Sequence, residues 1–278
     1  MKLIPRLTVK TMGLFFNSRY RLARWTRKSR LFNRIVTRTM FDGDDMIVVP
    51  KDSVARTRKV EVNIDIPDAG DRTVLPSEVV KSVIRKMDDR IFIMDFCLCR
   101  RSNKCEDYPV ERGCIFLGNG TERIPPEMGH MATVEETERY LDKCASMGLV
   151  HIIGRNKLDR VWLSTGKKND LMTICNCCPC CCLWNVTRDV SDDIAGIFKR
   201  MDGVEISADP EKCIGCGLCQ DICFTRAISI ADGRSVIEQS KCRGCGRCAG
   251  VCPNDAITIT YDEAKIESES DRIVSLFA

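Results

Sequence analysis

Histidine and recognisable catalytic motifs are scarce in this sequence. Only His130 and His151 occur in 278 residues, and neither lies in a motif. The chain has no Walker A loop, no G-x-G-x-x-G fingerprint, no H-E-x-x-H pair and no nucleophile elbow. Acid–base catalysis by histidine and hydride transfer from a bound nicotinamide therefore lack support, and both histidines are predicted to be structural.

Long apolar segments are missing too. No apolar run approaches the ~18 residues that a membrane-spanning helix needs. Basic residues, among them Arg6, Lys10 and Arg19, interrupt the first residues, where a secretory signal needs an unbroken apolar stretch of ~7–15 residues. We therefore expect a cytoplasmic protein whose cysteines stay reduced, with peripheral attachment to a membrane as an alternative.

Acidic residues are absent from the first 41 positions, which contain eleven lysines and arginines. This leaves 32 of the 43 basic residues in the rest of the chain, against all 39 acidic ones. Apolar residues such as Phe16, Trp25 and Ile35 recur among the cations at loosely helical spacing. Residues 1–41 are predicted to form a basic amphipathic arm that packs on the protein's own body, binds an acidic partner protein or lies on a membrane surface, with nucleic acid the least favoured partner.

The region after the arm contains a few recognisable elements. Residues 42–75 are predicted to form a connector with some extended structure, including an alternating segment at 60–66. A helix opening at Pro76-Ser77 and a buried strand at 91–94 follow. A last helix, at 192–201, leads into the C-terminal part of the chain.

The middle of the chain has the order helix then hairpin. Thr133 and Glu136 form a capping box that predicts a helix start. Residues 149–153 and 160–163 are predicted to pair as a hairpin. This order is winged-helix-like and admits a redox-sensing DNA-binding regulator, but four acidic residues on the helix would repel phosphate, so a scaffold role is favoured.

Cysteine, in contrast, is abundant, with 19 residues, and one repeat of 29 residues dominates its distribution. The C-x2-C-x2-C-x3-C run occurs twice, as Cys213-Ile-Gly-Cys216-Gly-Leu-Cys219-Gln-Asp-Ile-Cys223 and as Cys242-Arg-Gly-Cys245-Gly-Arg-Cys248-Ala-Gly-Val-Cys252. Each run continues into a short apolar strand. In a reducing compartment such a surplus of thiols points to metal rather than to disulfides.

Residues 205–262 resemble a bacterial-type dicluster ferredoxin, and the resemblance implies two hairpins and two short helices around two 4Fe-4S clusters. By the rule of that family, one cluster is held by Cys213, Cys216, Cys219 and Cys252, and the other by Cys242, Cys245, Cys248 and Cys223. The chain departs from the family at Phe224, where proline is usual. The ligand set is intact, so the departure affects only local loop geometry.

Eleven cysteines lie upstream of this repeat. Cys144 is predicted to be core packing. The other ten are candidate metal ligands in two groups, Cys97, Cys99, Cys105 and Cys114 in the first and Cys175, Cys177, Cys178, Cys180, Cys181 and Cys182 in the second. Six free thiols within eight residues would be prone to oxidation, so metal ligation is favoured, and iron–sulfur is favoured over zinc because the chain already carries such clusters.

Spacing does not decide which of these thiols share a metal. Two arrangements remain open: one unusual or higher-nuclearity cluster shared by both groups, or two separate clusters. The pattern C-x-C-R, G-C-I-x-L-G and C-N-C-C-x-C-C ahead of a dicluster ferredoxin resembles a group of iron–sulfur proteins of anaerobes, a resemblance that names no reaction. Arg100, Arg101 and Lys104 are predicted to be solvated surface.

These observations predict an α+β protein in which residues 71–204 form a mixed Cys-rich domain, followed by the ferredoxin-like domain and by a solvated acidic tail at 263–278. The favoured function is an electron-transfer protein or redox-complex subunit that passes single electrons between the ferredoxin-type clusters and an upstream centre, with redox proteins as partners. The alternative is a reductase or activating enzyme whose upstream cluster reduces a substrate or a partner's cofactor.

Overall fold

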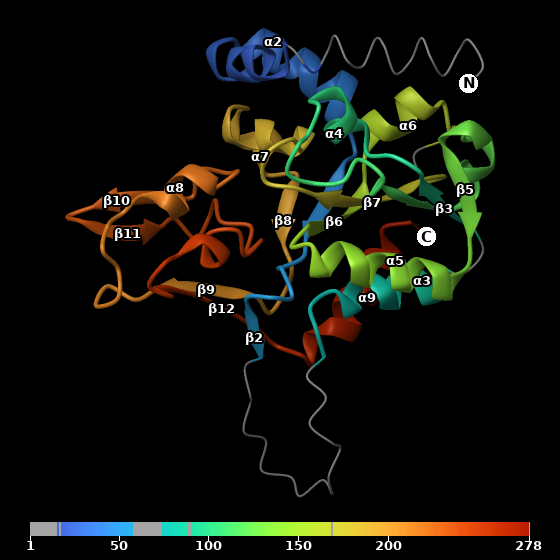
Figure 1. Ribbon diagram of the computed structural model, residues 1–278. Helices are drawn as coiled ribbons and strands as arrows, with labels where there is room; N and C mark the ends of the chain where they lie inside the picture. Colours follow the sequence, from blue (N-terminus) through green and yellow to red (C-terminus); the bar gives the residue numbers. More distant parts are fainter. Residues whose placement is uncertain (1–15, 17, 58–73, 88–89, 168, 278) are drawn as a thin grey trace, which may run out of the picture.

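The mixed α+β architecture is confirmed. The computed structural model describes residues 16, 18–57, 74–87, 90–167 and 169–277, so the alternating segment at 60–66 and most of residues 1–17 lie outside it (Figure 1). Among the described residues, no helix combines the length and hydropathy needed to cross a membrane.

A seven-stranded sheet organises the body of the protein, in the order β5-β3-β4-β7-β6-β1-β8. In that order the strands are Gly129–Ala132, Ile91–Met94, Ile115–Leu117, Met172–Cys177, Val150–Arg155, Asp45–Val48 and Phe198–Arg200. Within this sheet β1 and β8 pair in parallel, and the other neighbouring strands pair antiparallel. Side chains alternate between the two faces of each strand, and both faces are buried, so the sheet separates two apolar cores.

Helices α3 (Glu78–Lys86), α5 (Val134–Ser146) and α9 (Lys265–Ser275) lie on one side of this sheet (Figure 1). The predicted apolar face of α3 is buried, and the predicted strand at 91–94 is β3. Thr133 caps α5 as predicted, because its hydroxyl accepts a hydrogen bond from the Glu136 backbone N–H at 3.2 Å. The Glu136 carboxylate bonds His130 instead of closing the capping box.

The predicted hairpin at 149–153 and 160–163 is wrong. β6 pairs with β1 and β7, and the chain continues into helix α6 (Lys157–Leu163). A helix forms here because Asn156 caps it: the Asn156 side chain accepts hydrogen bonds from the backbone N–H groups of Leu158 and Asp159. The helix–hairpin order that suggested a winged helix is therefore not formed.

Three other segments differ from the prediction. The helix expected at 192–201 is limited to α7 (Asp192–Ala195), because the chain then enters β8 beside β1. Within the predicted connector, β1 is an inner strand of the main sheet, since its residues Met46, Ile47 and Val48 are apolar and fully buried. The tail contains α9, which packs on α3 and buries Glu269 against Arg272, 2.6 Å away.

The described part of the basic arm packs on the body. Residues 18–28 are helical and are followed by α2 (Arg30–Val36) and a π-helical turn, η1 (Thr37–Phe41). Phe16 and Ala23 are buried, and Arg27 Nε donates to the Val190 carbonyl at 2.7 Å. Trp25, Leu31 and Ile35 remain more than half exposed, so the arm also presents apolar side chains outward.

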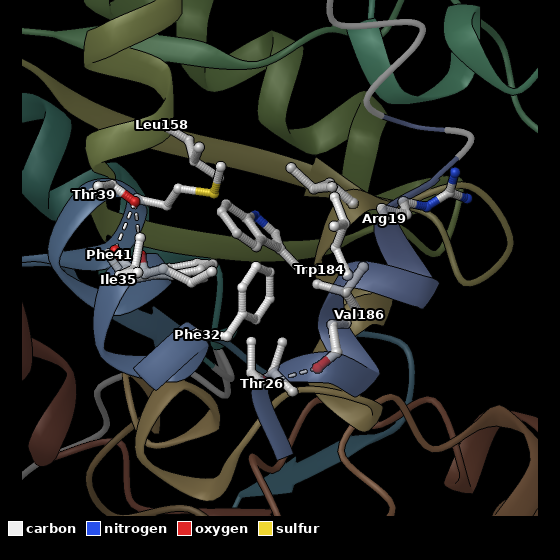
Figure 2. Close-up of a pocket in the computed structure, with 15 residues that line it drawn as sticks. Arg19, Thr26, Phe32, Ile35, Thr39, Phe41, Leu158, Trp184 and Val186 are labelled. Carbon is white, nitrogen blue, oxygen red and sulfur yellow. Dashed lines mark hydrogen bonds between the residues drawn. The ribbon is translucent and has the colours of Figure 1, made fainter. Parts of the chain in front are cut away.

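A cavity of about 250 Å³ lies beneath the arm. Figure 2 shows Phe32 and Trp184 reaching toward one another across it, with Ile35 and Leu158 on its wall. Its two threonines, Thr26 and Thr39, donate hydrogen bonds to the nearby backbone carbonyls of Ala23 and Ile35. The cavity lining is thus almost wholly apolar, and both the arm and the loop that follows the upstream cysteines contribute to it.

The C-terminal part adds two smaller sheets. β9 (Glu205–Ala208) and β12 (Ile257–Tyr261) pair antiparallel, while β10 (Ile228–Ala231) and β11 (Arg234–Ile237) form a hairpin. The short helices α8 (Leu218–Ile222) and η5 (Ala249–Val251) follow the cysteine loops. β2 (Ala55–Thr57) joins β12 in parallel, so residues from the N-terminal half complete this sheet.

His151 makes stability depend on pH. It is buried on β6, and its Nδ1–H donates to Asn176 Oδ1 at 2.8 Å, because the Asn176 amide N–H donates to the Gly113 carbonyl. Its Nε2 has no partner among the described residues. Burial, which disfavours a charged ring, lowers the pKa of His151 below its ordinary value.

Acid therefore destabilises the fold through His151. Below pH ~6.5 the unfolded chain binds a proton at this residue that the folded chain does not, so the free energy of unfolding falls by up to about 1.4 kcal/mol per pH unit. We expect H151Q to flatten this dependence in urea unfolding between pH 5 and 7. H130Q is the control of opposite sign, since burial lowers the pKa of exposed His130 but hydrogen bonds to Asp95 and Glu136 raise it overall. Equal slopes for wild type and H151Q would contradict the assignment.

Candidate metal centres

The structure brings Cys213, Cys216, Cys219 and Cys252 together around one small cavity, which we call set I. Three come from the first cysteine run and the fourth from the second. Backbone N–H groups point at two of the sulfurs, from Ser235 to Cys213 Sγ at 3.3 Å and from Ala256 to Cys252 Sγ at 3.2 Å. Such N–H donors stabilise thiolate ligands, so this donor set fits a cluster.

The other four ferredoxin-type cysteines, set II, also face one another. Burial and the neighbouring sulfurs of Cys245, Cys242 and Cys223 raise the pKa of the Cys248 thiol above its ordinary value. Backbone N–H groups of Ala227 and Gly244 lie 3.3 and 3.4 Å from the sulfurs of Cys223 and Cys242. Set II therefore combines three cysteines of the second run with one of the first, and it is more buried than set I.

Glycine is required in these loops. Gly215 has a φ of 67°, and a Cβ there would lie 2.4 Å from the Gly233 carbonyl oxygen.

Phe224, which replaces the usual proline, is buried against the core of the main domain. The Arg247 guanidinium lies over its ring, 5.1 Å from the centroid. The departure at 224 thus serves to pack set II against the rest of the protein.

Strand β7 divides the ten upstream cysteines between its two sides. Cys175 and Cys177 alternate with Ile174 and Asn176, so they lie on one face, in the core that contains Phe116 and Trp184. Just past the strand, Cys178 packs on the other side, with Cys144 of α5. The pleat of a single strand therefore separates cysteines that are adjacent in the sequence.

On the α5 side, Cys105, Cys178, Cys180 and Cys181 form a four-thiol group whose sulfurs all lie within 4.8 Å of one another. The sulfurs of Cys105 and Cys180 are 3.6 Å apart, and the Cys181 N–H lies 3.3 Å from Cys178 Sγ. A tetrahedral ion with metal–sulfur bonds of about 2.3 Å has sulfur–sulfur edges of about 3.8 Å. The group therefore fits a single zinc or iron ion better than a cubane, whose ligands lie further apart.

On the other side, six thiols lie near one another and are called the six-thiol group: Cys97, Cys99, Cys114, Cys175, Cys177 and Cys182. Cys182 Sγ lies 3.0 Å from Cys177 Sγ. Cys177 interacts electrostatically with Cys175, Cys175 with Cys114, and Cys99 with Cys97. The hydrogen bond from Cys99, opposed by burial and helped by Arg100, lowers the pKa of Cys97 to about 6.

Arg100 lies between the two thiol groups. Its side chain is completely buried, and its guanidinium donates to the carbonyls of Asn176, at 3.0 Å, and Arg112. Burial would lower its pKa, but the sulfurs of Cys97 and Cys178 outweigh that and raise it. The prediction that Arg100 is solvated is therefore wrong, because sulfur on both sides compensates a buried cation.

Arg101 and Cys144 agree with prediction. Arg101 is exposed, with its guanidinium 3.7 Å from the centroid of the Phe96 ring. Cys144 is buried in α5 and packs beside the four-thiol group without belonging to it.

Arg247 connects set II to the four-thiol group. It lies between Cys245 and Cys248 in the sequence, and its guanidinium is buried. It donates to the Cys178 carbonyl at 3.0 Å and to Asn185 Oδ1 at 2.9 Å. The role of Arg247 was not predicted, although an arginine inside a ligand loop is a visible signal in the sequence. No feature of the sequence singles out Asn176 or Asn185.

Comparison with protein families identifies a 4Fe-4S dicluster domain at residues 212–256. A comparison with curated proteins finds no match. The dicluster domain carries two 4Fe-4S clusters and implies a role in electron transfer, and the upstream cysteines include a group that can hold a further metal centre.

Proposed function

We propose that the protein is an electron-transfer protein or redox-complex subunit that passes single electrons between its two ferredoxin-type clusters and an upstream metal centre. Set I and set II would hold the 4Fe-4S clusters, and the four-thiol group would hold the upstream metal. Bound at these sulfurs, iron supplies one-electron redox chemistry. The observation that carries the proposal is the hydrogen bond from Arg247, in the loop of set II, to the Cys178 carbonyl.

The burial of the three sites favours an order for the electron path. Cys216 of set I is exposed, and Ile214 and Leu218 beside it are 62% and 48% exposed. This end of the protein, with β10 and β11, lies far from the seven-stranded sheet (Figure 1). We expect a redox partner protein to dock there on apolar side chains. Set II is then the relay, since Cys242 and Cys248 are buried and Arg247 contacts the upstream loop.

The basic arm is a second proposed contact, with an acidic protein surface or an anionic membrane. Trp25, Leu31 and Ile35 are exposed beside many cations, and such a surface suits either partner. The packing of the arm near Trp184 would bring that partner close to the upstream cysteines.

Electron transfer is preferred to the reductase alternative because of the ligand count. A reductase needs a metal position that protein sulfur leaves open, whereas four thiols within 4.8 Å satisfy a tetrahedral ion completely. The DNA-binding alternative was based on the predicted hairpin, and helix α6 forms in place of the second strand of that hairpin.

The test compares R247M with R243M in anaerobically purified protein. Both substitutions lie in the same loop, but Arg243 bonds the Ser240 and Ala195 carbonyls rather than the Cys178 loop. We expect R247M to keep its ferredoxin-type signals in electron paramagnetic resonance. Electron transfer from these clusters to the upstream centre is measured by rapid freezing after reduction. In R247M its rate should fall roughly tenfold, which corresponds to a barrier increase of about 1.4 kcal/mol. An upstream centre that never takes up an electron would refute the proposal.

A further inference from the structure

We propose that the six-thiol group, Cys97, Cys99, Cys114, Cys175, Cys177 and Cys182, holds a second upstream metal centre, a polynuclear iron–sulfur cluster distinct from the metal of the four-thiol group. This inference rests on the proposed function only in that the chain is loaded with iron and sulfide.

The sheet register builds this site. β4 and β7 pair with Ile115 opposite Ile174, so the next pair places Cys114 opposite Cys175. Cys177 lies two residues further along the same face of β7. The loop after β7 returns to the sheet and brings Cys182 Sγ within 3.0 Å of Cys177 Sγ. Four thiols from three segments thus line one face of the main sheet.

The remaining two thiols, Cys97 and Cys99, lie in the segment that follows the neighbouring strand β3. β3 ends at Met94, whose N–H bonds the Cys114 carbonyl at 3.0 Å, so the chain leaves the sheet beside Cys114. Cys97 then occupies the N-cap position of the short helix α4 (Leu98–Ser102), which contains Cys99. The sulfurs of Cys114 and Cys182 both lie close enough to influence the Cys99 thiol. Cys97 and Cys99 are therefore assigned to the same group as Cys114 and Cys182.

The number of ligands decides the kind of metal centre. A tetrahedral ion takes four thiolates, so six require more than one metal ion, and polynuclear sites built from thiolate are typical of iron–sulfur clusters. All six cysteines are free of disulfides and none is exposed. Arg100 supplies a buried positive charge that would offset the charge of a thiolate-ligated cluster, and its Nε has no partner among the described residues.

The same geometry separates this centre from the four-thiol group. The two groups lie on opposite sides of β7, and Arg100 reaches the β7 backbone between them, at the Asn176 carbonyl. A single cluster shared by all ten cysteines would have to reach around the backbone at residues 176–178, where Arg100 lies. The structure therefore favours two upstream centres over one.

The test uses matched pairs of substitutions in the full chain, purified without oxygen. Metal and acid-labile sulfide are counted per chain, and native mass spectrometry gives the mass of the loaded protein. We expect C175S/C177S to lose iron and sulfide together while keeping the metal of the four-thiol group. C105S/C180S should lose a single metal ion and no sulfide. Both should keep eight iron atoms in the ferredoxin-type domain, seen by electron paramagnetic resonance.

Two results would overturn the inference. Unchanged iron and sulfide in C175S/C177S would mean that the six thiols bind no cluster, and the loss of one and the same centre in both variants would mean a single shared site. The number of metal ions bound by the unsubstituted protein is a second test that does not depend on the folding of a variant. A total of only nine metal ions per chain would also exclude the second upstream centre. Loss of the ferredoxin-type irons in the unsubstituted protein would instead refute the proposed function.

Discussion

Replacing Arg100 by methionine should destabilise the loaded protein by about 3–5 kcal/mol, the usual cost of removing one partner from a buried charge pair. Arg100 is fully buried, donates to the Asn176 and Arg112 carbonyls, and lies beside sulfurs of both upstream thiol groups. Methionine has a similar volume but neither charge nor donors. Buried carbonyls and anionic sulfur would then lose their compensation. Anaerobic urea unfolding followed by circular dichroism measures the loss.

The matched control is R101M, one residue along the same helix. Arg101 is exposed, and its guanidinium lies over the Phe96 ring, so its replacement should cost at most about 1 kcal/mol. Iron content adds a second readout, because R100M should release upstream metal during gel filtration and R101M should not. Equal stability of R100M and R101M would contradict the role assigned to Arg100.

Removal of iron should unfold the cysteine loops of the C-terminal part. Structural metal binding contributes on the order of 10 kcal/mol, comparable to the ~5–15 kcal/mol stability of a whole domain. The hairpin β10–β11 has little core of its own, since exposed and half-exposed side chains alternate along β11. Without metal, the thiolates of set I and set II would also repel one another.

Hydrogen exchange after anaerobic chelation measures this effect. We expect amides at 213–252 to lose nearly all protection, whereas β1 and β6 keep theirs, because they pack through fully buried apolar residues such as Ile47 and Ile153. Restoring iron and sulfide should restore protection at 213–252. Retained protection there in iron-free protein would show that the loops fold without clusters.

The parts of the fold that local patterns determine were predictable. Both cysteine runs, helix α3 and the cap of α5 follow from spacing that the sequence displays directly. Errors arose where tertiary contacts decide. Residues 198–200 form a strand because β1 offers them an edge, and no local signal distinguishes them from a continued helix. Asn156 lies in the loop of the predicted hairpin, but its side chain caps helix α6 instead.

The grouping of the upstream cysteines could not be predicted for the same reason. Cys177 and Cys178 are adjacent in the sequence but lie in different groups, because β7 ends between them and the pleat sends them to opposite sides. Cys105 joins Cys178 across 73 positions through packing alone. The choice between one shared cluster and two separate ones needed the sheet register.

The parallel pairing of β2 with β12 limits how the ferredoxin-like unit can be reused. Cut out as residues 205–262, this unit would expose the edge of β12, and unpaired edges invite strand-to-strand aggregation. Transplanting it as an electron-carrying cassette onto another protein would therefore require residues 51–57 as well, although they stand about 150 positions earlier in the chain. Gene fusions that contain the cysteine repeat without residues 51–57 should yield insoluble products.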